Sequence, residues 1–290
     1  MMEIKKAIIP LAGLASRFLP LSGVISKELL PLADLPMIHY VVQEARDAGI
    51  KEIIFVLNPE RKKVLDYFRP CPKIEKFLKS LKKDNILKEL KSQQETFKDI
   101  SFSYVLQKKP LGDGHAVFQA AKLMDQEPVV CMFADDIIDS KTPGIMQLTK
   151  VFKTCQKPVI GLFRVGKEIS NYGAVGVEKI ANRLFKIKKI IEKPDSESVL
   201  SDLAIVGRYV LTPEVFDYLK KAKPTKRGEI ILADVFNNQM LQEGKVIYGY
   251  ELEGKWLECG DKRRWLKSNL YFSLKNQKYG PDLKDYLRRI

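Results

Sequence analysis

The sequence predicts an α/β protein whose sheet is doubly wound, mostly parallel and flanked by helices. Two observations predict this fold class. Residues 7–9 and 52–57 are short, uninterrupted apolar runs, which are typical of strands buried in a parallel sheet. Between them, residues 36–49 have proline at the start, apolar side chains at helical spacing and glycine at the end. A strand, a helix and a second strand form a βαβ unit, and this unit makes the two strands parallel.

The later part of the chain repeats this alternation. Helical patterns cover residues 60–68 and residues 73–90, where the amphipathic pattern breaks near Asp84. We expect further strands at residues 102–107, 128–133, 159–165 and 184–191, and further helices at residues 144–154 and 262–275. The prediction is a single domain over residues 1–290. Residues 262–290 form its C-terminal helical segment, which is a candidate contact in a homo-oligomer.

Composition limits the classes of function. The chain has 290 residues, of which 45% are hydrophobic and 30% charged, as in a globular protein. Its formal net charge of +14 favours anionic ligands. The lysines of residues 73–91 alternate with apolar residues as on a solvated helix face, and no nucleic-acid-binding module is recognisable, so we expect no nucleic-acid partner.

The same survey predicts the compartment. No apolar span is long enough to cross a bilayer and no signal-peptide pattern is present, so we expect no membrane partner. The four cysteines are widely scattered, without the spacing of a metal or redox motif. These features predict a reduced, cytoplasmic protein.

The turn after the first strand suits a phosphate group. It includes Gly13, which lets the main chain approach a ligand without a Cβ in the way. Successive backbone N–H groups in such a turn attract anions, and Arg17 and Lys27 can add two positive charges. An ordinary strand-to-loop turn with two solvated basic residues would have the same pattern, so both interpretations stay open.

Two more predicted strands end in polar loops that would lie at the same edge of the sheet. Gln107 offers a donor and an acceptor to the edge of a base, and Gly112 leaves room for a flat ring against the backbone. A helix-capping loop that contacts no ligand is the alternative. Asp135 and Asp136 follow the next strand, where adjacent carboxylates need water or a cation to offset their charge. A solvated pair of turn residues fits this spacing equally well.

A third group of residues suits a sugar phosphate. Gly173 would let a sugar ring meet the main chain, while Glu192 can accept hydroxyl protons and Lys193 can meet a phosphate dianion. A charged strand terminus before a proline is the alternative for the last two.

Several of these segments resemble one family in order and spacing. Residues 12–31 resemble the amino-terminal signature of the sugar-1-phosphate nucleotidylyltransferases, and residues 111–116 (LGDGHA) resemble the branch that transfers uridylyl groups. The resemblance continues at residues 172–173, 192–194, 202–211, 228–234 and 255–262. It implies a Rossmann-like nucleotidyltransferase fold and transfer of the uridylyl group of UTP to glucose-1-phosphate, giving UDP-glucose and pyrophosphate.

The resemblance also implies roles for individual residues. The catalytic residues would be Arg17, Lys27 and Lys193. The substrate-binding residues would be Ala12, Gly13, Gln107, Gly112, Gly173, Glu192 and Lys193. Asp135 and Glu258 would bind Mg²⁺, with Asp136 as the alternative to Asp135. The implied cofactor is Mg²⁺, and the implied ligands are UTP, glucose-1-phosphate and UDP-glucose.

Four positions depart from the family's usual pattern. The family has glycine at the position of Ala15, lysine at Gly23, proline at Ala134 and aspartate at Glu258. Two alternatives stay open. One is a relative that makes another UDP-sugar or a dTDP-sugar, because the choice of base and sugar depends on a few contacts. The other, which follows from the departures at Ala15, Gly23 and Glu258, is a weakly active or non-catalytic protein that binds a sugar nucleotide.

Overall fold

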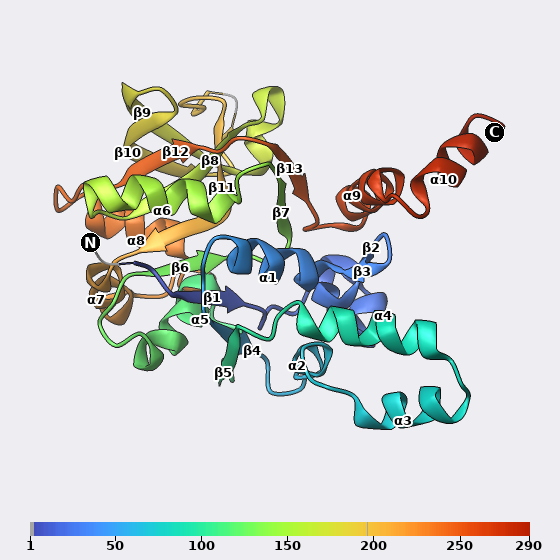
Figure 1. The fold of residues 1–290 in the computed structure, drawn as a ribbon. Helices are drawn as coiled ribbons and strands as arrows, with labels where there is room; N and C mark the ends of the chain where they lie inside the picture. The colour runs from blue at the N-terminus through green and yellow to red at the C-terminus, as the bar shows by residue number, and fades with distance from the viewer. Residues whose placement is uncertain (1–2, 196) are drawn as a thin grey trace.

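A computed structural model describes residues 3–195 and 197–290 (Figure 1). Its main feature is a nine-stranded sheet in the order β5-β4-β1-β6-β11-β8-β12-β10-β9. These strands are β1 Lys6–Pro10, β4 Glu52–Leu57, β5 Ser101–Leu106, β6 Val129–Met132, β8 Val159–Arg164, β9 Gly173–Ala181, β10 Leu184–Glu192, β11 Leu203–Leu211 and β12 Tyr248–Glu251. Two small antiparallel pairs lie apart from it, β2 Pro31–Leu32 with β3 Leu35–Pro36 and β7 Asp136–Asp139 with β13 Lys255–Glu258.

The helices alternate with the strands along the chain. They are α1 Met37–Asp47, α2 Val64–Tyr67, α3 Pro72–Ser80, α4 Asp84–Glu95, α5 Asp113–Gln119, α6 Gly144–Cys155, α7 Pro213–Lys221, α8 Leu232–Val235, α9 Lys262–Lys275 and α10 Gly280–Leu287. In the described ranges, no helix combines the length and the apolar character needed to cross a membrane.

The sheet is mixed, so the prediction of a mostly parallel sheet is not confirmed. β5, β4, β1 and β6 are parallel neighbours, and we call them the parallel half. The mixed half consists of β11, β8, β12, β10 and β9; in it only β8 and β12 are parallel neighbours. At the edge formed by β10 and β9, the reason for the antiparallel pairing is the short connection. Only Asn182 and Arg183 separate β9 from β10. So short a connection joins antiparallel strands.

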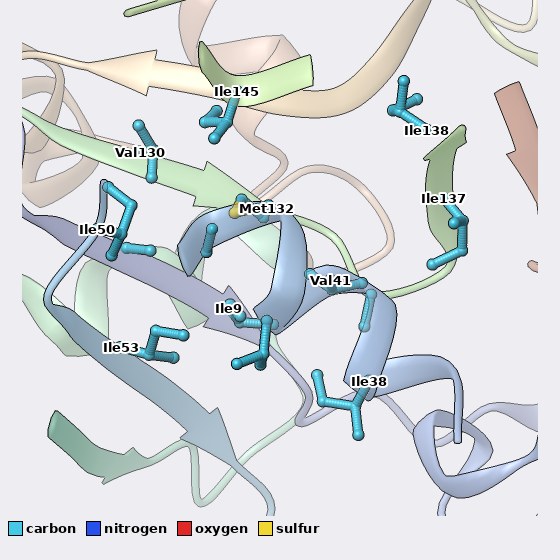
Figure 2. Packing of buried hydrophobic residues seen from close by; sticks show 14 of the residues in the cluster. Ile9, Ile38, Val41, Ile50, Ile53, Val130, Met132, Ile137, Ile138 and Ile145 are labelled. Atoms are coloured by element: carbon cyan, nitrogen blue, oxygen red, sulfur yellow. The ribbon is translucent and has the colours of Figure 1, made fainter. Parts of the chain in front are cut away.

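Helices cover both faces of the sheet, as a doubly wound fold requires. Alternate residues of β1 show the two faces. Ala7 and Ile9 belong to one core cluster with residues of α1 and α6, and Ile8 belongs to a second cluster with residues of α5, α7 and α8. Figure 2 shows the first cluster, where Ile9 and Val41 lie close to Met132. This packing fixes the strand ends from which the polar loops start.

Most predicted elements are present, with two informative changes. The predicted helix at residues 60–68 is reduced to α2, because the side chain of Asn58 accepts from the N–H of Glu60 (2.9 Å) and turns the chain. The amphipathic pattern at residues 73–90 forms two helices, α3 and α4, and the break falls at residues 81–83, just before Asp84.

The C-terminal helix α9 packs against the loop that follows β1. Lys262 Nζ donates to the carbonyl of Leu19 (2.6 Å), and Asn269 Oδ1 accepts from the N–H of Ala33 (2.7 Å). Helix α10 continues beyond α9 and projects from the body of the protein (Figure 1). A role for residues 262–290 in an oligomer stays a prediction.

Candidate active site

Two adjoining cavities open at the ends of the central strands. The first has a volume of about 460 Å³ and the second of about 410 Å³. Gly112, Asp113, Phe133, Asp135 and Glu229 line both of them. The first cavity lies where β1, β5 and β6 end, and β1 is the strand from which the chain order departs in both directions. Ligands of open α/β sheets bind at such a switch point.

The structure brings all the predicted site residues to these two cavities. Ala12, Gly13, Lys27, Gln107, Gly112 and Asp135 line the first, and Arg17, Gly112, Asp135, Asp136, Gly173, Glu192, Lys193 and Glu258 line the second. The sequence segments that seemed separate are therefore one site. The roles of its residues remain predictions.

The loop after β1 forms one wall of the first cavity. A Cβ added at Gly13 would meet no atom within 4 Å, so the backbone here faces open space. Ala15 adopts a left-handed conformation, with φ of 52° and ψ of 42°. This is the conformation for which a glycine is favoured, and a residue with a Cβ pays about 1–2 kcal/mol to adopt it. Arg61 holds the loop by donating to the carbonyls of Leu14 (3.1 Å) and Ser22 (3.0 Å).

Lys27 and Asp135 form an ion pair at the junction of the two cavities. Lys27 Nζ lies 2.8 Å from Asp135 Oδ2. Burial disfavours the charged form of the lysine, but the Asp135 and Glu28 carboxylates outweigh it and raise the pKa of Lys27. Burial likewise opposes ionisation of Asp135, yet the charge of Lys27 holds the pKa of Asp135 below its usual value. Both groups are therefore charged at neutral pH, in place for an anionic ligand and a cation.

Gln107 and Gly112 line the first cavity, and Gly112 lines the second one as well. Gln107 Nε2 donates to the carbonyl of Gly112 (2.9 Å) and so holds this loop. Gly112 has φ of 95°, and a Cβ there would lie 2.4 Å from the carbonyl oxygen of Ile230. The glycine thus lets residues 228–231 approach, which brings Glu229 to both cavities. Position 112 therefore requires glycine because of this close contact with the backbone of Ile230.

Both carboxylate oxygens of Asp136 are engaged within the protein, which does not fit the role of a metal ligand. Its Oδ2 accepts from the N–H of Gly207 (2.9 Å) and its Oδ1 from the indole of Trp256 (2.6 Å). Burial and the neighbouring charge of Asp135 raise the pKa of Asp136 to about 7. A Cβ at Gly207 would lie 2.5 Å from Asp136 Oδ2, so only glycine lets the strand come this close. Asp136 therefore anchors the loop that presents Asp135.

Arg208 supports the same loop from within the core. It is fully buried and donates to the carbonyls of Phe133 (3.0 Å) and Asp136 (2.5 Å). Its charge is balanced by Glu44 of α1, at 2.7 Å. Buried ion pairs need this kind of complete hydrogen bonding to offset the loss of hydration. The pair joins α1, β11 and the loop that carries Asp135.

The second cavity is built on antiparallel pairing. Gly173 at the start of β9 lies opposite Glu192 at the end of β10, and a Cβ on Gly173 would lie 3.0 Å from Glu192 Oε2. Burial raises the pKa of Glu192, and the charge of Lys193 opposes that rise. The N–H of Lys193 donates to the carbonyl of Tyr172 (2.9 Å). Glu192, the hydrogen-bond acceptor, and Lys193, the cation, therefore line the cavity side by side at the end of β10.

The β7–β13 ribbon carries Glu258 to the same place. Its register sets Glu258 opposite Asp136, and the N–H of Cys259 donates to the carbonyl of Asp135 (2.6 Å). Both oxygens of Glu258 are engaged. Oε2 accepts from the hydroxyl of Tyr172 (2.7 Å) and Oε1 from Arg264 (2.9 Å).

The donor set suits a hard cation only in part. Asp135 is an ionised carboxylate at the junction of the cavities, which is the type of ligand Mg²⁺ prefers. Asp136 and Glu258 are held by other groups. Within residues 3–195 and 197–290, no cluster of three or more His, Cys, Asp or Glu side chains could hold an ion. A magnesium ion would need phosphate oxygens or water for its remaining ligands.

Several site residues were not predicted from the sequence. Glu28, Asp113 and Glu229 line a cavity, while Arg61 and Arg208 position its loops. Glu28 and Asp113 adjoin residues of the predicted loops, and that proximity was the available signal. The two arginines gave none, because each acts on a loop distant in sequence.

Comparisons with known proteins agree with this geometry. Residues 6–272 match the family described as nucleotidyl transferase. UTP–glucose-1-phosphate uridylyltransferase 1 of Staphylococcus saprophyticus subsp. saprophyticus is 37% identical over 290 residues, which is 100% of this chain and 99% of that protein.

Two solved structures are similar along almost the whole chain. UDP-glucose pyrophosphorylase complexed with UDP-glucose has a TM-score of 0.83 at 33% identity, covering 94% of this chain and 100% of that one. UTP-bound UGPase from Acinetobacter baumannii has a TM-score of 0.89 at 30% identity, covering 99% of this chain and 100% of that one. The resemblance noted in the sequence is thereby confirmed. Because these matches run from end to end, the chain belongs to the nucleotidyl transferase family, among its UTP–glucose-1-phosphate uridylyltransferases.

Proposed function

We propose that this protein transfers the uridylyl group of UTP to glucose-1-phosphate and releases pyrophosphate, giving UDP-glucose. One observation carries the proposal. The two cavities share Asp135, and four cations, Arg17, Lys27, Lys193 and Arg264, line them. Two anionic substrates need such a cationic junction in order to meet.

The first cavity is the proposed nucleotide site. The backbone at Gly13 is open to a triphosphate, and Ala12 lies beside it. Gln107 and Gly112 also line this cavity, and a uracil ring would lie against their loop. Lys27 would then face the α-phosphate or the departing pyrophosphate.

The second cavity is the proposed sugar-phosphate site. Glu192 and the backbone at Gly173 would bind glucose hydroxyls, and Lys193 would hold the phosphate. Arg17 lines this cavity, and its positive charge, with that of Lys193, opposes the burial that raises the pKa of Glu192.

The reaction needs alignment more than proton transfer. The attacking group is a phosphate oxygen that already carries negative charge, so no side chain has to remove a proton. Holding two reactants in line can supply about 7 kcal/mol or more of the barrier. Lys27 and Arg17 would neutralise the charge that collects on the leaving pyrophosphate. Asp135 would hold Mg²⁺, which when bound neutralises phosphate charge.

A pyrophosphate-release assay tests the proposal. Purified protein is incubated with Mg²⁺, one nucleoside triphosphate (UTP, dTTP, CTP or ATP) and one sugar-1-phosphate (glucose, galactose or N-acetylglucosamine). We expect the highest kcat/KM for UTP with glucose-1-phosphate. A higher value for another pair would reassign the substrates, and binding of UDP-glucose without any turnover would make the protein a sugar-nucleotide-binding relative.

A further inference from the structure

Asp113 begins α5 and lines both cavities. Its Oδ1 accepts from the N–H of Gly114 (2.6 Å) and from the N–H of Leu232 at the start of α8 (2.9 Å). These two bonds fix the orientation of the carboxylate and connect α5 to α8. One oxygen of Asp113 is therefore engaged within the fold.

The other oxygen, Oδ2, is open to a ligand. It accepts no hydrogen bond from any group of residues 3–195 and 197–290. In the same ranges, Thr212 Oγ1 is the one side-chain polar atom that is buried without a partner, so Asp113 Oδ2 is not enclosed by protein. The spaces that Asp113 lines are the two cavities. A carboxylate oxygen in this position requires a donor from water or from a ligand.

The charge of Asp113 limits what that ligand atom can be. Burial raises the pKa of Asp113 to about 6, although the two backbone N–H groups act to lower it. At pH 8 the carboxylate is therefore ionised and can only accept hydrogen bonds. A phosphate oxygen would be repelled, whereas a hydroxyl group can donate to it.

The neighbours of Asp113 belong to the second cavity. Burial is the main cause of the raised pKa of Asp113, and the charge of Glu192 adds to it. Burial also raises the pKa of Tyr209, and there the charge of Asp113 adds to the effect. Glu192 and Tyr209 line the second cavity and not the first. Because interactions between charges weaken with distance, Asp113 lies near the residues of the proposed sugar-phosphate site.

A hexose carries the donors that this part of the cavity requires. Each free hydroxyl group of the ring can donate one hydrogen bond. Asp113 and Glu192 both offer carboxylate oxygens, and a hydrogen bond to a charged acceptor is about twice as strong as one between neutral groups. The ribose hydroxyls of the nucleotide are the other possible donors, and they would reach Asp113 from the first cavity.

We propose that Asp113 accepts a hydrogen bond from one hydroxyl group of the hexose and so makes the second cavity selective for sugars that carry this hydroxyl. The inference rests on the proposed function, because it assumes that the second cavity holds the sugar. A deoxy sugar leaves the charged oxygen without its donor, and an unpaired charged group in a binding site is costly. Sugars that lack this hydroxyl are therefore poor ligands.

Calorimetric titration at pH 8 tests the contact without turnover. The ligands are UDP-glucose, each analogue that lacks one hexose hydroxyl, an analogue that lacks the ribose 2′-hydroxyl, and UMP. The proteins are native, Asp113→Asn and Asp234→Asn. Asparagine keeps one oxygen for the N–H groups of Gly114 and Leu232 and replaces Oδ2 with an NH₂ donor. Asp234 is the matched control, because its charge also acts on Asp113 but it lines neither cavity.

The expected result is a loss that Asp113 and one hexose hydroxyl share. The native protein binds the analogue without that hydroxyl about 10- to 100-fold more weakly than UDP-glucose. Asp113→Asn weakens UDP-glucose binding by a similar factor, binds that analogue no more weakly than it binds UDP-glucose, and keeps the native affinity for UMP. Asp234→Asn shows the native pattern with every ligand.

Three results overturn the inference. One is an Asp113→Asn variant that binds UDP-glucose as tightly as the native protein does. Another is a variant that loses UMP and UDP-glucose binding equally, because Asp113 would then act only through the fold. The third is a shared loss with the ribose 2′-hydroxyl in place of a hexose hydroxyl.

The proposed function fails separately. If the native protein turns over UTP and glucose-1-phosphate but no hexose hydroxyl shares its loss with Asp113, only the role of Asp113 is wrong. If the shared loss appears without turnover of any substrate pair, only the proposed reaction is wrong.

Discussion

The parallel half and the mixed half of the sheet build their cavities in different ways. The first cavity is lined mainly by segments that directly follow β1, β5 and β6. The second depends on antiparallel register, because β9–β10 pairing sets Gly173 opposite Glu192 and β7–β13 pairing sets Glu258 opposite Asp136. A loop after a parallel strand is encoded in adjacent residues, whereas a paired position depends on a distant strand.

This difference suggests a division of work. The first cavity carries the ion pair between Lys27 and Asp135, so changes there should affect the chemical step. The second carries Lys193 and Glu192 at the end of β10, so changes there should affect how the acceptor sugar phosphate is bound. The variants described next test this division.

Removing the Lys27–Asp135 pair should have the largest effect. We expect Lys27→Ala and Asp135→Ala each to lower kcat by about 10³-fold, because each removes a preorganised charge at the reacting phosphates. The measurement is the rate of UDP-glucose pyrophosphorolysis, with the urea unfolding midpoint as the check on folding. Lys109→Ala, at an exposed lysine of the neighbouring loop, is the control. Near-native rates in either variant of the pair would contradict the assignment.

Removing the buried ion pair between Arg208 of β11 and Glu44 of α1 should chiefly lower stability. Arg208→Met leaves Glu44 as an unpaired buried charge, which costs about 3 kcal/mol or more of unfolding free energy. The double variant Arg208→Met/Glu44→Met should regain much of this loss, because it removes both charges. Urea titration of the three proteins measures the effect. If the single variant is as stable as the native protein, the pair does not hold the halves together.

The sugar-phosphate side is tested by Lys193→Ala. We expect KM for glucose-1-phosphate to rise about 10- to 50-fold, the size of one charge-assisted contact to phosphate, while KM for UTP changes little. Lys189→Ala, at an exposed lysine of β10, is the control and should leave both constants unchanged. A defect confined to UTP would place Lys193 on the wrong side of the site.

Buried His39 of α1 should give stability a pH-dependent component. Burial lowers the pKa of His39 to about 4, below the value of 6.5 in the unfolded chain. Between these values His39 binds more protons in the unfolded state, so its contribution to stability is lost as the pH drops. From pH 7 to pH 5 the loss from His39 is about 2 kcal/mol. His39→Gln should lose about 2 kcal/mol less than the native protein over the same interval in urea unfolding, and an equal loss would contradict the assignment.

Relief of the left-handed alanine should have the smallest effect. Ala15→Gly should raise the unfolding free energy by about 0.5–1 kcal/mol, because glycine adopts φ of 52° without a Cβ clash. Ala33, with φ of 55°, lies outside both cavities and provides the control. Ala33→Gly should give a similar gain in stability with no change in KM for UTP. A loss of stability in Ala15→Gly would show that the loop is not strained.

The sequence was most informative about the parallel half. The bounds of β4 are those of the predicted strand, and the loops at Gly13, Gln107 and Asp135 were each identified at the strand end where the structure has them. Buried parallel strands are continuous apolar runs, and the loops after them share one edge of the sheet, so local patterns were sufficient.

The mixed half was harder for a physical reason. The pattern at residues 184–191 identified a strand, but nothing local sets its partner or its direction, and the direction decides which side chains meet. The same holds for Arg264 and Glu229, whose partners lie in other segments. Asp136 shows a further limit of prediction from sequence patterns. Its position beside Asp135 fits a metal ligand, but its two oxygens accept hydrogen bonds from Gly207 and Trp256.

Helix α9 holds the loop after β1 and the β2–β3 hairpin, although it contributes no residue to the lining of the first cavity. Besides the bonds to Leu19 and Ala33, the indole of Trp265 donates to the carbonyl of Pro31 (3.1 Å). These three bonds join residues that are 243, 236 and 234 positions apart in the chain. The shape of one wall of the first cavity therefore depends on a helix that contributes no residue to its lining.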